Sequence, residues 1–228
     1  MTHKTFFAAI TAFVASFIFG ADVSANDGAY QVVSPDGHLS ATVVVGSDIS
    51  YTVSRDALQL IAPSQISMTL SDGIVFGQDD KVRKVRRDSR DQVWQATVYK
   101  KSDVRDHYNE MTLEFKEFSL TFRAYDDGVA YRFASKLKGD FTVMSEKAEF
   151  AFAKDWDAFI PYVKQHTKTL ETQYFNSFEN TYKEHRLSEW NKSRLAFAPL
   201  VVNADNGVKV LLTEADLLDY PGMFLYNE

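Results

Sequence analysis

Carboxylate, amide and aromatic side chains are concentrated in residues 164–193. This stretch lacks the alternation of apolar and polar residues that is typical of a strand. These side chains are most frequent in 178–190, where Glu179 and Asn180 follow Phe178. Calcium takes oxygen ligands, and sugars bind aromatic faces beside planar polar groups. Loops of this length are usually functional or disordered, and the aromatic content disfavours disorder. The stretch therefore suits calcium or sugar binding, with a polar surface loop as the alternative.

A second cluster of polar residues, 105–110, has the sequence Arg-Asp-His-Tyr-Asn-Glu. A histidine beside a carboxylate suits acid–base chemistry. In the alternative, structural interpretation, Asp106 and Asn109 hold the start of a strand, while His107 and Tyr108 fill an interface between domains. We assign this group no catalytic role. The sequence also contains no nucleophile elbow, glycine-rich phosphate loop or zinc-ligand spacing.

The segments that must position these residues have the pattern of strands. In 105–115 and 120–133, apolar residues alternate with polar ones, and Asp-Asp-Gly at 126–128 predicts a hairpin. The alternation at 39–45 follows a Ser-Pro-Asp-Gly turn. Further strands are expected at 49–54, 58–61, 66–70, 82–85, 93–99, 141–145, 148–152 and 158–160, with a last hairpin around 205–207. Many short strands separated by Gly/Asp turns predict an all-β sandwich.

Composition narrows the class of protein. The chain has 228 residues, a formal net charge of -6 and no cysteine. This acidity disfavours non-specific nucleic-acid binding, which needs a basic footprint. The basic residues between 81 and 87 are interpreted as the solvated side of a strand, with a polyanion site as the alternative. Without cysteines, the fold has no disulfides and depends on its core.

Residues 1–25 have the features of a signal peptide. A short basic head precedes the apolar run 6–19, and Val-Ser-Ala at 23–25 fits a cleavage site. We expect a mature chain that begins near Asn26, has no membrane span and resides in the periplasm. The apolar run is too short for a typical transmembrane helix; an uncleaved anchor is the alternative.

The sequence of residues 105–115 and 120–133 closely resembles that of the amino-terminal domain of family 97 glycoside hydrolases, which are α-glucosidases and α-galactosidases. The resemblance spans roughly residues 33–225. It implies an all-β fold, an antiparallel β-supersandwich like that of galactose mutarotase, packed against a (β/α)8 barrel. The catalytic carboxylates of the family lie at the ends of barrel strands, so no catalytic residue is expected in this chain.

The resemblance also implies two sites. A glutamate seven residues before an Arg-Leu-Ser-Glu stretch holds calcium in the family, and this position is Glu179, before 186–189. Members carry a motif similar to Glu-Ala-Asp-Leu-Leu-Asp-Tyr at 214–220, so Glu214 is expected to bind substrate across the domain boundary. The alternative is a turn in which Asp219 accepts backbone hydrogen bonds.

The expected organisation is a signal peptide followed by one domain, 26–228, which is incomplete at its carboxyl end and lacks the catalytic barrel. Its partners would be an oligosaccharide, the barrel of the same protein and a shared calcium ion. Alone, this chain is expected to be inactive. The alternative is a stand-alone sandwich that binds carbohydrate or protein. The choice between glucoside and galactoside, or between inversion and retention, depends on barrel residues.

Overall fold

A computed structural model describes residues 28–164, 169–176, 179–218 and 220–228. The expected signal peptide, 1–25, and Asp219 lie outside the described residues. The described chain is built almost entirely from antiparallel strands, with short 3-10 turns, which confirms the all-β prediction. Within these ranges, no helix has the length and apolar character needed to cross a bilayer.

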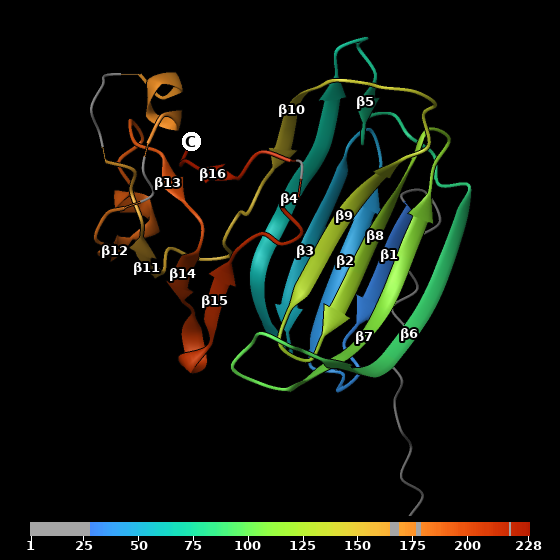
Figure 1. Cartoon of the computed structure of the whole chain (residues 1–228), viewed down its shortest axis with the longest axis horizontal. Helices are drawn as coiled ribbons and strands as arrows, with labels where there is room; N and C mark the ends of the chain where they lie inside the picture. The colour runs from blue at the N-terminus through green and yellow to red at the C-terminus, as the bar shows by residue number, and fades with distance from the viewer. Residues whose placement is uncertain (1–27, 165–168, 177–178, 219) are drawn as a thin grey trace, which may run out of the picture.

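The first sheet contains six strands in the order β1-β2-β3-β4-β10, with β5 paired to β4 (Figure 1). These strands are β1 (Gly28–Val33), β2 (Leu39–Val45), β3 (Ile49–Arg55), β4 (Leu58–Leu70), β5 (Val75–Phe76) and β10 (Val143–Ala148). Strand β4 is longer than either predicted segment because β3 pairs with its first half and β10 with its second. The predicted strands 58–61 and 66–70 are therefore one strand.

The second sheet is a four-stranded meander of β6 (Lys84–Gln95), β7 (Asp103–Glu114), β8 (Phe118–Tyr125) and β9 (Val129–Ser135). The predicted alternation is confirmed along β8, where every second residue, from Phe118 to Ala124, is buried. Strand β6 differs, because it is exposed along almost its whole length. Its basic residues are solvated as expected, and Arg86 pairs with Glu114.

The two sheets face each other and enclose the core. Strands β1 and β2 pack against β7, β8 and β9. Phe118 lies at the centre, with its ring centroid 4.4 Å from that of Phe115 and 4.7 Å from that of Phe76. Tyr51 of the first sheet meets Phe122 of the second at 5.8 Å. Because each strand presents alternate residues inwards, this apolar layer fixes the register of both sheets.

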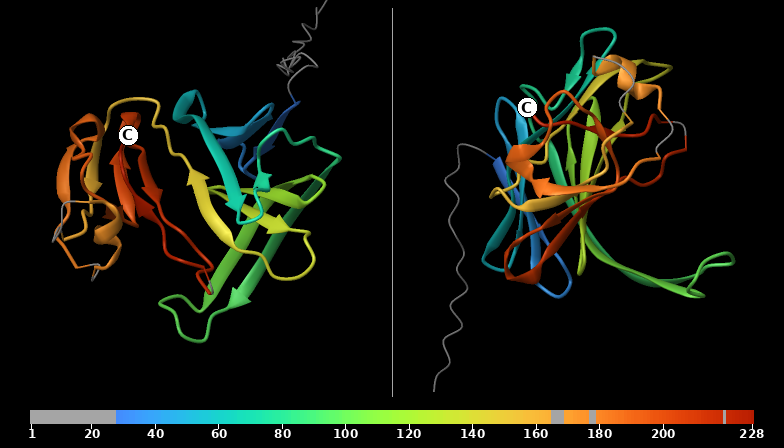
Figure 2. Two further views of the ribbon diagram at one scale, coloured as in Figure 1. Left: turned by 90° about the horizontal axis from the view of Figure 1, so that it is seen from above. Right: turned by 90° about the vertical axis from the view of Figure 1, so that its left-hand side faces the viewer.

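The remaining strands gather at one side of the sandwich, next to the carboxyl terminus (Figures 1 and 2). They form the sheet β12-β11-β14-β15 and the pair β13-β16. Their bounds are β11 (Asp157–Ile160), β12 (Lys183–Arg186), β13 (Ala196–Phe197), β14 (Leu200–Asn203), β15 (Lys209–Leu212) and β16 (Phe224–Leu225). The 3-10 turns are η1 (Glu171–Tyr174), η2 (Leu187–Glu189) and η3 (Asp205–Gly207). Buried residues of this side, such as Trp156 and Ala158, join the core of the sandwich.

Further predictions about elements are wrong in detail. The predicted strands 82–85 and 93–99 both overlap the single strand β6, which pairs with β7 along its whole length. Strand β12 lies inside the segment predicted as one loop, because pairing with β11 compensates for the missing apolar alternation. Strand β1 was not predicted, since only Val32 of its residues is fully buried. A single strand, β10, spans the end of predicted strand 141–145 and the start of 148–152, in register with β4.

Candidate functional site

Glu179 lies on the connection that leads into β12, and it is exposed. The next residue anchors this connection, because the Asn180 side-chain amide donates a 2.8 Å hydrogen bond to the carbonyl oxygen of Tyr162. Asn180 Oδ1 in turn accepts the backbone N–H of Thr181 at 2.9 Å. The hydrogen bonds of Asn180 therefore fix the backbone next to Glu179. The Glu179 side chain is exposed to solvent, which suits a ligand for an external cation.

An aromatic cluster supports the base of this connection. Tyr162 is buried, stacks on His185 with a centroid distance of 5.7 Å and meets Trp190 edge-on at the same distance. The guanidinium of Arg194 lies 4.6 Å from the Tyr162 ring centroid. Burial raises the pKa of Tyr162, so its hydroxyl stays protonated and accepts the N–H of Asn191 at 2.8 Å. The cluster thus packs β12, through His185, against Tyr162 and Trp190.

Asp155 fastens the Arg-Leu-Ser-Glu turn to the rest of the chain. Its Oδ1 accepts the Ser188 N–H at 2.8 Å, and its Oδ2 accepts the Ser188 hydroxyl at 2.9 Å. Arg186 donates to the Asp155 carbonyl oxygen at 2.7 Å. The hydrogen bonds from Ser188, with a smaller contribution from Arg186, hold the pKa of Asp155 below its usual range. Sequence reasoning missed Asp155, because no local pattern marks its partners.

We expect this anchor to weaken in acid. A carboxylate with a lowered folded-state pKa stabilises the fold above its unfolded pKa, about 3.9 for aspartate, and loses that effect as pH falls through the lower folded value. The Ser188 amide signal, followed by NMR from pH 7 downwards, should therefore change below about pH 4. Asp155→Asn should abolish this transition, whereas Asp157→Asn, at an exposed position of β11, should keep it. An unchanged transition in Asp155→Asn would contradict the assignment.

Glu214 has a defined partner. Both of its carboxylate oxygens accept the backbone N–H of Met223 at 2.9 Å, and the side chain is half-buried. The carboxylate therefore closes the segment that leads into β16. The alternative assigned such a role to Asp219, which lies outside the described residues. The contact with substrate expected for Glu214 stays a prediction.

Replacing Glu214 by alanine should release this closed segment. A hydrogen bond to a charged acceptor contributes about 1.5–3 kcal/mol, so amide exchange at Met223 should rise roughly tenfold or more. Hydrogen exchange read by mass spectrometry measures this. Glu171→Ala, at an exposed position in η1, is the matched control and should leave Met223 unchanged. Equal exchange in the Glu214 variant and the unaltered chain would refute the closing role.

The polar group 105–110 lies inside β7 and not at the start of a strand. Tyr108 is buried against Tyr125 and beneath Arg123, whose guanidinium lies 4.2 Å from the ring centroid. Asn109 donates to the carbonyl oxygen of Val33 at 2.8 Å and ties the two sheets together. Asn109 therefore joins the two sheets, whereas Tyr108 lies on the outer face of the second sheet with Tyr125 and Arg123. The role of Tyr108 in a domain interface stays a prediction.

The described residues hold no group of three or more His, Cys, Asp or Glu side chains placed to bind a metal ion. Calcium takes six to eight oxygen ligands, and Glu179 provides at most two. A calcium site that includes Glu179 therefore needs several further oxygen ligands besides this carboxylate. The exposed position of Glu179 is compatible with that arrangement.

Residues 32–228 match the family model described as "Glycosyl-hydrolase 97 N-terminal". The chain belongs to glycoside hydrolase family 97. It corresponds to the amino-terminal domain of this family, as the resemblance predicted. The chain is 44% identical over 198 residues to the retaining alpha-galactosidase of Bacteroides thetaiotaomicron, with 86% of this chain and 30% of that protein covered. The chain thus spans about a third of the length of this relative.

Solved family 97 structures have the same fold. Two structures of a family 97 enzyme from Pseudoalteromonas sp. strain K8, in complex with panose and with acarbose, match with a TM-score of 0.73. They are 25% and 26% identical and cover 87% of this chain and 30% of theirs. A beta-arabinopyranosidase, 23% identical with a TM-score of 0.68 over 80% of this chain and 31% of its own, shares the fold.

Proposed function

We propose that this chain is the amino-terminal supporting domain of an exported α-glycosidase that hydrolyses α-glucosidic or α-galactosidic bonds. The observation that carries the proposal is the family match over residues 32–228, together with a relative that is a retaining alpha-galactosidase. The chain covers 30% of that relative, which leaves ample length for a catalytic (β/α)8 barrel. Export to the periplasm follows from the signal-peptide pattern of residues 1–25.

The surface of the domain supports a barrel as its partner. Val98, at the tip of the β6–β7 hairpin, is 95% exposed, and Leu218 is 83% exposed. Both views of Figure 2 place that tip and the segment before β16 on the same side of the molecule. A two-stranded ribbon alone is marginally stable in water, and exposed apolar patches mark interaction sites. We propose that this side receives the barrel.

In this proposal, Glu179 is the calcium ligand that the domain contributes. Bound calcium would fix the geometry of neighbouring carboxylates and offset their mutual repulsion. The aromatic cluster around Tyr162 and the Asp155 anchor would hold the Glu179 backbone in place. Glu214 would act in the same interface. It would close the segment before β16 and contact the oligosaccharide substrate there.

A chimaera tests the proposed function. In the relative from Bacteroides thetaiotaomicron, the matched amino-terminal segment is replaced by residues 26–228 of this chain. Hydrolysis of nitrophenyl α-galactoside and α-glucoside is then measured with calcium and after chelation. We expect calcium-dependent turnover by the chimaera and none by this chain alone. Turnover by this chain alone, or an inactive chimaera whose two parts are both folded, would contradict the proposal.

A further inference from the structure

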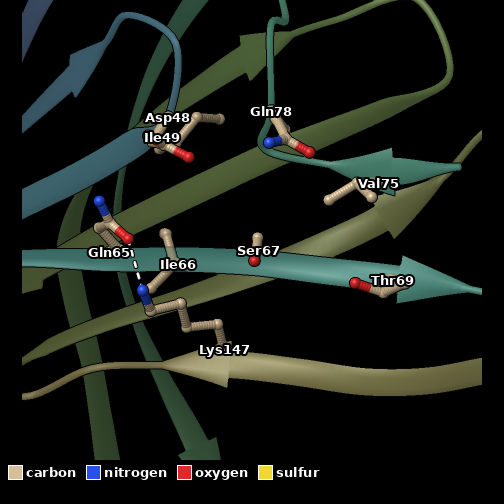
Figure 3. A pocket seen from close by; sticks show the side chains of 9 residues that line it. All are labelled: Asp48, Ile49, Gln65, Ile66, Ser67, Thr69, Val75, Gln78 and Lys147. Atoms are coloured by element: carbon tan, nitrogen blue, oxygen red, sulfur yellow. Dashed lines mark hydrogen bonds between the residues drawn. The ribbon is translucent and has the colours of Figure 1, made fainter.

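A polar hollow lies on the outer face of the first sheet, where β4 runs between β5 and β10 (Figure 3). Gln65, Ser67 and Thr69 alternate along β4, so their side chains share one face. Lys147 of β10 borders one side of this row, and Gln78 lies on the other (Figure 3). The hollow has a volume of about 210 Å³, and its remaining lining residues are Asp48, Ile49, Ile66 and Val75.

The lining offers both hydrogen-bond donors and acceptors. Ser67 and Thr69 contribute hydroxyl groups to the lining, and Gln78 contributes a side-chain amide. Among the lining residues drawn in Figure 3, the one marked hydrogen bond joins Lys147 to Gln65, so it involves none of these three side chains. Val75 adds an apolar surface beside them. Hydroxyls and amides next to an apolar wall match a ring that carries hydroxyl groups on one edge and C–H groups on another.

Charge and size restrict the ligand further. The ammonium of Lys147 lies 3.3 Å from the Glu149 carboxylate and also contacts Gln65, while Asp48 adds a negative charge to the rim. The positive charge is therefore balanced, which disfavours phosphate or another anion. The volume lies below the range of about 300–1,000 Å³ that is typical of pockets for drug-sized ligands, so the ligand is a single small ring.

We propose that this hollow binds one neutral hexopyranose ring at the end of an oligosaccharide. It would be a second carbohydrate site on the domain, formed entirely by the first sheet and the turns beside it. The lining of the hollow alone would form this site, so the site does not depend on Glu179, on calcium or on a barrel. In a whole glycosidase of the proposed kind, such a site would hold one end of an oligosaccharide while another bond of that oligosaccharide is hydrolysed.

NMR of the whole 15N-labelled chain, titrated with methyl α-D-glucopyranoside or methyl α-D-galactopyranoside, tests this site. We expect saturating shifts confined to the side-chain amides of Gln65 and Gln78 and the backbone of 67–69. Replacing Ser67 by alanine together with Thr69 by valine should weaken binding roughly tenfold or more, through two lost hydrogen bonds. Thr52→Val, the same change on the outer face of β3 and outside the hollow, should leave binding unchanged.

Three results would overturn the proposal. The first is no shift at about 10 mM glycoside, which is ten times the concentration that half-saturates a 1 mM site. The second is an equal response to glycerol, or shifts scattered over the whole chain. The third is a stronger response to inorganic sulfate than to either glycoside. The titration of the unaltered chain decides between these results even if the double variant fails to fold.

Discussion

Replacing Phe118 by alanine should lower the free energy of unfolding by about 3–5 kcal/mol, the range for truncating a large buried aromatic residue. Phe118 is fully buried, and its ring lies between those of Phe115 and Phe76 at centroid distances of 4.4 and 4.7 Å. The truncation removes one member of a stacked triplet that joins the two sheets, and close packing limits how far the neighbours collapse into the cavity. Urea unfolding followed by circular dichroism measures the loss.

The matched control is Phe175→Ala, because Phe175 is 89% exposed. This change should alter the free energy of unfolding by less than about 0.5 kcal/mol, as is usual for surface positions. A loss below 1 kcal/mol for Phe118→Ala, by the same standard, would mean that the contact between the sheets does not carry the stability assigned to it.

Replacing Glu179 by glutamine in the chimaera should weaken calcium binding by about 100-fold or more. Changing an outer-shell partner of a metal ligand already costs 10–100-fold in affinity, and this change removes a charged ligand itself. Hydrolysis should fall with the calcium occupancy and recover in excess calcium. Isothermal calorimetry and a calcium titration of the rate measure the two effects.

Glu184→Gln provides the control for Glu179, because it makes the same chemical change on exposed β12 of the same connection. It should leave the calcium affinity unaltered. Loss of calcium binding in both variants would indicate damage to the connection as a whole. Unchanged affinity in Glu179→Gln would remove Glu179 from the calcium site.

Strands with one buried face could be predicted from the sequence, and the others could not. Along β8, the alternation from Phe118 to Ala124 exists because one face meets the core. Strand β6 is exposed on both faces, so its charged sequence has no period, and only pairing with β7 makes it a strand. The same holds for β12, whose Lys-Glu-His-Arg sequence resembles a loop.

The candidate sites show a similar division. The resemblance pointed to Glu179 and Glu214 as the positions of interest, and the structure places the first in solvent and the second on the Met223 amide. That contact could not be predicted, because it depends on how the chain folds back before β16. The Asp155 anchor and the hollow around Ser67 join residues far apart in sequence, so no local pattern marks either.

A crystal structure of the calcium-loaded chimaera tests the central claim most directly, since the account assigns one carboxylate of this domain to a calcium site shared with the barrel. We predict a carboxylate oxygen of Glu179 within about 2.3–2.6 Å of a calcium ion whose other ligands come from the barrel and water. A fully coordinated calcium ion without Glu179 among its ligands would contradict the account.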